Sequence, residues 1–177
     1  MTPRRPTRRR SLIPQMGVLT ALLTSALPAC GVQPSGVIGA GEPPTGLTKA
    51  LRLYFVSPTG HLEGVSRPDV QITALDAALK LLAAGPTEQE QNRGLTTLVA
   101  AVPYDATGEA TRVTLRAPGT TFSGNSRDDL VNGQLVCTLA RAQSALDPTI
   151  RPDDVQVTLI GDDHPLGPYR CSQFMGG

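Results

Sequence analysis

The first thirty residues of the chain differ in pattern from the rest and constrain what can fold. Five of the residues 4–10 are arginines and none is acidic. A mostly apolar run over 12–27 follows, and small residues precede Cys30. A charged start, a short apolar stretch and a small-residue cleavage point are typical of a secretory signal. Because the broken apolar run falls short of the roughly 20 residues that cross a bilayer, we expect 1–29 to be a signal peptide that is removed on export.

The end of this signal, Leu27-Pro28-Ala29-Cys30, resembles the lipobox of bacterial lipoproteins. In that family the cysteine sulfur receives a diacylglyceryl group and the chain is cut just before it. The resemblance implies that Cys30 anchors the mature protein to the extracytoplasmic face of the cell membrane. An ordinary signal with a chance cysteine is the alternative. The segment 7–12 loosely resembles a twin-arginine signal, but Ser11 replaces the usual aromatic, so the export route stays open.

The segment 30–48 is rich in Gly, Pro, Ser and Thr and carries one charge, Glu42. It shows neither helical nor strand periodicity, and such a composition cannot bury enough apolar surface to order itself. We expect a flexible tether here and a single folded domain over 49–177.

The charge of the mature chain disfavours some functions. Without the five signal arginines, eleven basic residues stand against fifteen acidic ones, a net charge of about −4. Nucleic-acid binding depends on clustered Lys and Arg, so we expect no nucleic-acid partner. Lys80 is the only lysine well inside the domain, which also argues against a polybasic lipid site.

Hydrophobic periodicity predicts alternating strands and helices in the domain. A strand over 51–56, the turn Ser57-Pro58-Thr59-Gly60 and a second strand over 61–67 predict a hairpin. A helix capped by Thr73 should stop at Gly85-Pro86, and the capping box from Thr87 to Glu90 predicts a short helix after it. A strand around 112–116, a helix from Ser126 to about 146 and a strand over 155–159 complete the pattern. We therefore expect an α+β fold, a small mixed β-sheet with two main helices packed on one face.

Four parts of the domain together form a pattern: Leu53-Tyr54-Phe55-Val56, Leu81-Leu82-Ala83-Ala84-Gly85-Pro86-Thr87, Glu90 and Gly94-Leu95-Thr96-Thr97. This pattern is similar to the GerMN domain of spore-germination and sporulation proteins, which also occurs in actinobacterial lipoproteins. The resemblance covers roughly 49–160. It implies helices on one side of a three- or four-stranded sheet, as in the ring-building modules of secretion assemblies. It also implies a binding or assembly role at the cell envelope, without known catalysis.

The two histidines offer little chemistry. His61 lies next to the predicted turn, where we expect it to be solvated. His164 follows Asp162 and Asp163, a cluster that could in principle hold a divalent cation. Three adjacent residues do not easily converge on one ion, so a polar surface loop is the better interpretation and we expect no metal.

Carboxylate pairs occur at Asp128-Asp129 and Asp153-Asp154, at starts of predicted elements, where acids favour a helix dipole or a turn. The sequence contains no familiar nucleophile, metalloprotease or phosphate-binding motif. We therefore expect no catalytic residues and no cofactor. The favoured function is a module that docks to an envelope protein or a cell-wall polymer; a cell-wall-active hydrolase with an unrecognised carboxylate site is the alternative. The oligomeric state stays open.

The remaining cysteines, Cys137 and Cys171, are expected to form a disulfide. They are the only pair left once Cys30 is acylated, and thiols oxidise in exported proteins. At 100° per residue, Cys137 projects roughly 150° from the centre of the apolar stripe of its helix. It should therefore point away from the core, where the C-terminal segment could cross the helix and bring Cys171 to it. The stripe itself comprises Val131, Leu135, Thr138, Leu139, Ala142 and Leu146.

Overall fold

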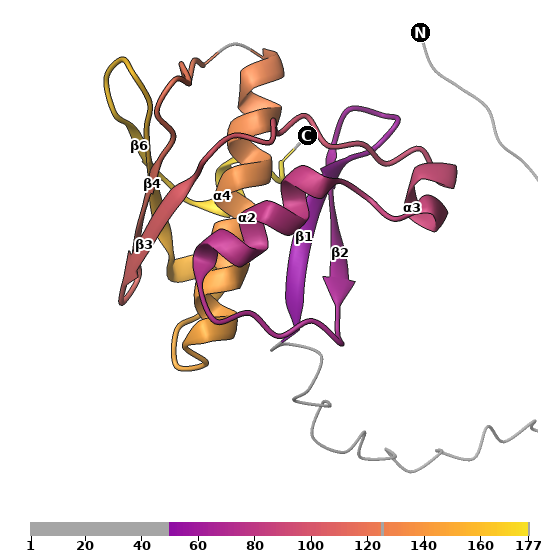
Figure 1. The fold of residues 1–177 in the computed structure, drawn as a ribbon, viewed down its shortest axis with the longest axis horizontal. Coiled ribbons are helices and arrows are strands. Elements are labelled where there is room, and N and C mark those ends of the chain that lie inside the picture. The colour runs from indigo at the N-terminus through magenta and orange to yellow at the C-terminus, as the bar shows by residue number, and fades with distance from the viewer. Residues whose placement is uncertain (1–49, 125, 177) are drawn as a thin grey trace, which may run out of the picture. The chain divides into compact units, whose positions relative to one another are not determined.

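The computed structural model describes residues 50–124 and 126–176, which belong to one compact unit. These residues form two β-sheets and three α-helices (Figure 1), so the expected α+β class is confirmed. The expected signal peptide (1–29), Cys30 and the expected tether (30–48) lie outside the described residues. None of the described helices has the length and apolarity that a membrane-crossing helix requires.

The first sheet is the predicted hairpin. Strand β1 (Leu51–Val56) pairs antiparallel with β2 (Leu62–Arg67). Gly60 closes the turn between them with a φ of 79°, a left-handed conformation that glycine adopts without strain. Five of the six residues of β1 are buried, so β1 lies inside the molecule on both of its faces.

The second sheet has four strands in the order β3 (Asp105–Glu109), β4 (Arg112–Arg116), β5 (Gln156–Ile160) and β6 (Leu166–Tyr169). Strands β4 and β5 are parallel and the outer pairs are antiparallel, so this sheet is mixed. A parallel pair requires a crossover connection, which the long helix after β4 provides. The single sheet expected from the sequence is therefore divided into two, and β3 and β6 are strands that the sequence pattern did not predict.

The helices are α2 (Leu75–Ala84), α3 (Glu88–Asn92) and α4 (Ser126–Leu146). The capping box at the start of α3 is present as predicted. The expected threonine cap of α2 is wrong: Ala74 holds the cap position and makes no side-chain hydrogen bond. Two short 3-10 turns follow α4, η1 (Pro152–Asp154) and η2 (Cys171–Gln173).

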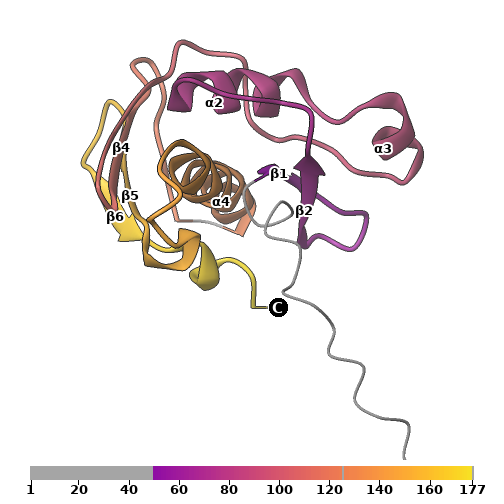
Figure 2. The same cartoon turned by 90° about the horizontal axis from the view of Figure 1, so that it is seen from below.

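Helix α4 lies at the centre of the domain rather than on one face of a sheet. Figure 2 shows it with the four-stranded sheet on one side, the hairpin on the other and α2 alongside. Every residue from 132 to 140 is buried, which a helix with a single apolar stripe would not show. The predicted stripe therefore described only part of a helix that is enclosed on nearly all sides. Leu146, expected at its end, is 36% exposed.

Polar side chains of α4 take the place of a neighbouring strand along β1. The backbone N–H of Tyr54 donates to Thr138 Oγ1 at 3.1 Å, and the Tyr54 carbonyl accepts from Gln134 Nε2 at 2.9 Å. Gln134 Oε1 accepts in turn from the backbone N–H of Leu98 at 2.9 Å. Buried backbone groups need such partners, so the helix completes the inner edge of β1 and keeps the two sheets apart.

Candidate functional site

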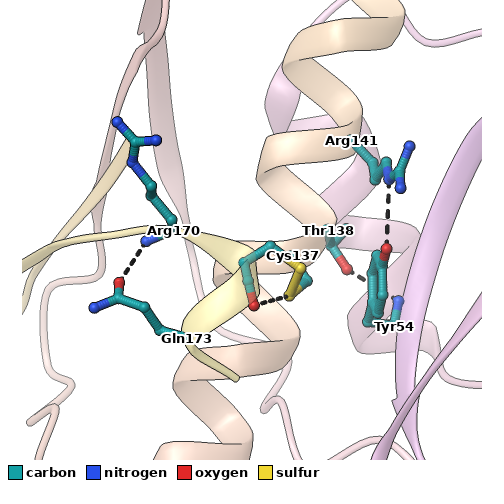
Figure 3. Close-up of a disulfide and its surroundings, with 7 residues drawn as sticks. Tyr54, Cys137, Thr138, Arg141, Arg170 and Gln173 are labelled. Atoms are coloured by element: carbon teal, nitrogen blue, oxygen red, sulfur yellow. Dashed lines mark hydrogen bonds between the residues drawn. A yellow bond between two sulfur atoms is a disulfide. The ribbon is translucent and has the colours of Figure 1, made fainter. Parts of the chain in front are cut away.

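A disulfide joins α4 to the C-terminal tail, residues 170–176. Cys137 and Cys171 are bonded with an S–S distance of 2.01 Å, the pairing expected from the sequence (Figure 3). Cys137 is fully buried although it lies off the predicted stripe, because η2 packs over that side of α4. Its sulfur also lies 3.5 Å from the Cys171 carbonyl oxygen, a contact without a donated hydrogen because a disulfide sulfur carries none.

Beside this disulfide the tail forms one wall of a cavity of about 420 Å³, which we call the tail pocket. The other walls come from the β1–β2 turn and from the first turns of α4. Polar and apolar side chains share its lining. The polar side chains are those of His61, Asp129, Tyr169 and Gln173, and the apolar ones are those of Leu62, Leu130, Phe174 and Met175.

The tail is held in this position by close packing as well as by the disulfide. The rings of Tyr169 and Phe174 meet edge to face, with centroids 5.5 Å apart. Arg170 donates its backbone N–H to Gln173 Oε1 at 2.7 Å. A Cβ added at Gly133 of α4 would lie 3.0 Å from the Phe174 Cβ and 2.7 Å from a methyl of Leu62. The glycine inside α4 therefore lets both the hairpin and the tail approach the helix.

A second cavity, of about 530 Å³, lies between α2 and the segment 101–104. We call it the α2 groove. Most of its lining is apolar, and alanines make up much of it. The lining residues are Asp76, Leu79, Lys80, Ala83, Ala84, Ala101, Val102, Pro103 and Tyr104.

The polar side chains of the α2 groove differ in whether other groups of the domain already bind them. Asp76 accepts a hydrogen bond from the backbone N–H of Ala106 in β3 at 2.8 Å, so its carboxylate serves the fold. Tyr104 donates its hydroxyl to the Ala100 carbonyl, and burial raises the pKa of this phenol above its usual value. Lys80 is exposed and has no ion-pair partner among the described residues. The groove is thus an apolar surface with one available cation at its rim.

The most enclosed ion pair among the described residues lies outside both cavities. Arg67 of β2 makes two hydrogen bonds to the carboxylate of Glu90, at 2.5 and 2.7 Å, and Glu90 is only 8% exposed. Glu90 also accepts from the backbone N–H of Thr87 at 2.9 Å. The Arg67 guanidinium holds the pKa of Glu90 below its usual value. This pair attaches α3 to the hairpin and therefore has a structural role.

The structure separates the residues singled out in the sequence. His164 and Asp163 are exposed, and Asp162 accepts from the backbone N–H of Gly119 at 2.9 Å. Among residues 50–124 and 126–176, no three His, Cys, Asp or Glu side chains gather as a metal site would require. His61, by contrast, is exposed at the rim of the tail pocket.

The two carboxylate pairs lie in different elements, α4 and η1. Asp153 and Asp154 are exposed in η1, while Asp129 lines the tail pocket and the side chain of Asp128 lies outside the described part of the chain. No pattern in the sequence indicates that Asp129, His61 and the tail share a cavity. These residues are far apart in the sequence, and they come together only because α4 lies at the centre of the domain.

Comparison of the chain with known protein families, characterised proteins and solved structures gives no match. The cavities and their lining residues therefore provide the basis for a functional proposal, together with the sequence signals.

Proposed function

We propose that this chain is an exported lipoprotein, anchored to the cell membrane through Cys30, and that its domain is a non-catalytic GerMN-like binding or assembly module at the envelope. The observation that carries the binding role is the α2 groove, which exposes a concave apolar surface. Apolar concavities on a protein surface favour contact with a partner. A protein segment whose apolar side chains fill the groove and whose carboxylate pairs with Lys80 fits this surface.

Two features support the export of the domain. The disulfide between Cys137 and Cys171 belongs to oxidising compartments, because cytosolic thiols are kept reduced. The signal-like start and the lipobox-like end at Cys30 agree with that location. No observation favours the alternative hydrolase, since the described lining of each larger cavity holds one carboxylate, whereas glycoside hydrolysis usually uses a pair.

Photocrosslinking in living cells tests the docking surface. A photoreactive residue at Ala84, on the exposed rim of the α2 groove, should yield a discrete covalent adduct. The same residue at Gln89, exposed on α3, is the matched control and should not yield it. Lys80→Glu should remove the adduct because it reverses the charge at the rim. Identical adducts from both positions, unaffected by the charge reversal, would contradict docking at the groove.

Cell fractionation tests the anchor. Cys30→Ala should either release the protein from membranes or leave the signal uncut, because no sulfur is present to carry the diacylglyceryl group. The two acyl carbon chains together bury many methylenes, each worth about 0.8 kcal/mol, so their loss abolishes stable anchoring. A Cys30→Ala protein that fractionates and migrates like the wild type would show that the chain is not a lipoprotein.

A further inference from the structure

The tail pocket has a lining suited to a ligand different from the partner of the α2 groove. We propose that it binds a saccharide ring without net charge, as a second site on the domain. The inference goes beyond docking through the groove and rests on different residues. The volume of the tail pocket, about 420 Å³, lies within the range of small-molecule sites.

The polar side chains of the pocket can both donate and accept hydrogen bonds, as sugar hydroxyls require. Asp129 supplies carboxylate acceptors, and the imidazole of His61 can do either. Arg170 occupies Gln173 Oε1, which leaves the Gln173 Nε2 group as a donor. Each hydroxyl of a sugar is itself a donor and an acceptor, so this mixture matches a polyol more closely than it matches a purely anionic group.

The charge of the lining selects against anions. Neither Lys nor Arg is among the described residues that line the pocket, whereas Asp129 carries a negative charge there. A phosphate or carboxylate would meet this like charge, and the described lining supplies no cation to offset it, which is unfavourable. A neutral sugar avoids that cost.

The apolar side of the pocket fits the C–H face of a pyranose ring. The half-buried rings of Tyr169 and Phe174 pack edge to face in the lining, and Met175, which also lines the pocket, is 48% exposed. Exposed apolar side chains that border a cavity mark a surface that a ligand can cover. Leu62 and Leu130 add further apolar side chains to the lining.

The disulfide fixes the geometry of the site. Gln173 and Met175 follow Cys171 by two and four residues, so the bond to Cys137 holds their backbone against α4. The other polar side chains come from the β1–β2 turn, from β6 and from α4 itself. Saccharide binding should therefore depend on the oxidised state of this cysteine pair.

An NMR titration tests the site. The full chain carrying Cys30→Ser, which prevents acylation, is oxidised in vitro and titrated with the soluble trisaccharide of N-acetylglucosamine. We expect saturable amide shifts confined to the pocket residues. Gln173→Ala and Asp129→Asn should each weaken binding roughly five-fold, the effect of losing one or two hydrogen bonds. The matched controls Gln89→Ala and Asp153→Asn, at exposed positions that do not line the pocket, should bind like the parent.

Three further arms decide the outcome. Retention of the protein on insoluble cell-wall glycan, lost with Gln173→Ala, would identify the polymer as the source of the sugar. Reduction of the disulfide should abolish the sugar-induced shifts while the amide spectrum stays dispersed, as it does for a folded protein. If reduction unfolds the domain, the Gln173→Ala and Asp129→Asn titrations decide whether the pocket binds the sugar. No saturable shift with millimolar sugar, or stronger binding of a simple alkylamine at Asp129, would overturn the proposal. Crosslinking at the α2 groove is unaffected by that result, so the two proposals can fail separately.

Discussion

At the scale of single residues, the Arg67–Glu90 pair shows how a short helix without an apolar stripe stays attached. Helix α3 contributes mainly polar side chains, and Glu90 is its one buried residue. Glu90 closes the capping box of its own helix and also receives both hydrogen bonds from Arg67. The sequence predicted the capping box, because that motif is local. It could not predict Arg67, which lies 23 residues away and meets Glu90 only after the hairpin forms.

Replacing Glu90 tests the contribution of this pair. Glu90→Gln should lower the free energy of unfolding by about 2 kcal/mol at neutral pH, because it leaves the largely buried Arg67 without a carboxylate. Urea unfolding of the variant and the wild type measures the difference. Glu88→Gln, at an exposed position of the same helix, is the control and should change stability little. Equal losses in the two variants would show that the ion pair is not the cause.

The same carboxylate makes stability depend on pH. Because Arg67 lowers the pKa of Glu90 in the folded state, Glu90 takes up its proton more readily when unfolded, where its pKa is about 4.3. The stabilisation is therefore complete above that value and is lost as pH falls through the lower, folded pKa. The stability difference between wild type and Glu90→Gln, measured by urea unfolding from neutral to strongly acidic pH, should shrink over this range. A difference that is constant with pH would contradict the assignment.

At the scale of elements, helical and alternating patterns in the sequence located most strands and helices. They did not show which elements pack against one another. Strand β3 reads Asp-Ala-Thr-Gly-Glu and has no buried residue, so it carries no apolar alternation to detect. Strand β6 is a short edge strand that contains Gly167 and Pro168. In α4, Gln134 and Thr138 are polar residues at buried positions. Their role depends on the backbone of β1, and no pattern within the helix itself reveals it.

Removing one of these helix–strand bonds tests the edge that α4 completes. Thr138→Val keeps the shape of the side chain but leaves the buried N–H of Tyr54 without an acceptor, so the free energy of unfolding should fall by about 1–2 kcal/mol. Thr107→Val, on the exposed strand β3, is the matched control and should cost little. Urea denaturation compares the two. A loss no larger than that of the control would show that the bond contributes nothing to stability.

At the scale of the whole molecule, the sequence predicted the α+β class and the disulfide pair but not the division into two sheets. A central helix enclosed by both sheets, α2 and the tail is a consequence of contacts that the periodicity of one segment does not contain. The cavities follow from that arrangement, since the tail pocket joins residues as distant in the chain as His61 and Met175. The residues of the candidate site could therefore not be predicted for the same reason as the division into two sheets: both depend on contacts between distant segments.

The disulfide should make a large contribution to global stability. It closes a loop with a sequence separation of 34, which stabilises the fold by about 3–4 kcal/mol in the chain-entropy description. Urea unfolding with and without reductant should show this difference. Thiol labelling of the denatured, unreduced domain should detect neither Cys137 nor Cys171 until reductant is added. Two labelled thiols before reduction would contradict the bond.

The bonds between Tyr54 and α4 also determine the order in which the chain can acquire its structure. They join residues that are 80 and 84 positions apart, a separation typical of slow-folding topologies. A chain that emerges amino end first presents its hairpin long before Gln134 and Thr138 arrive. Until then the N–H and carbonyl of Tyr54 lack these partners, although Val56 on the same edge of β1 already pairs with Thr96. An edge that is uncovered at its centre is a template for pairing with other chains. Truncations that end before Thr138 should therefore self-associate. In the complete fold, α4 protects the edge of β1 from pairing with other chains.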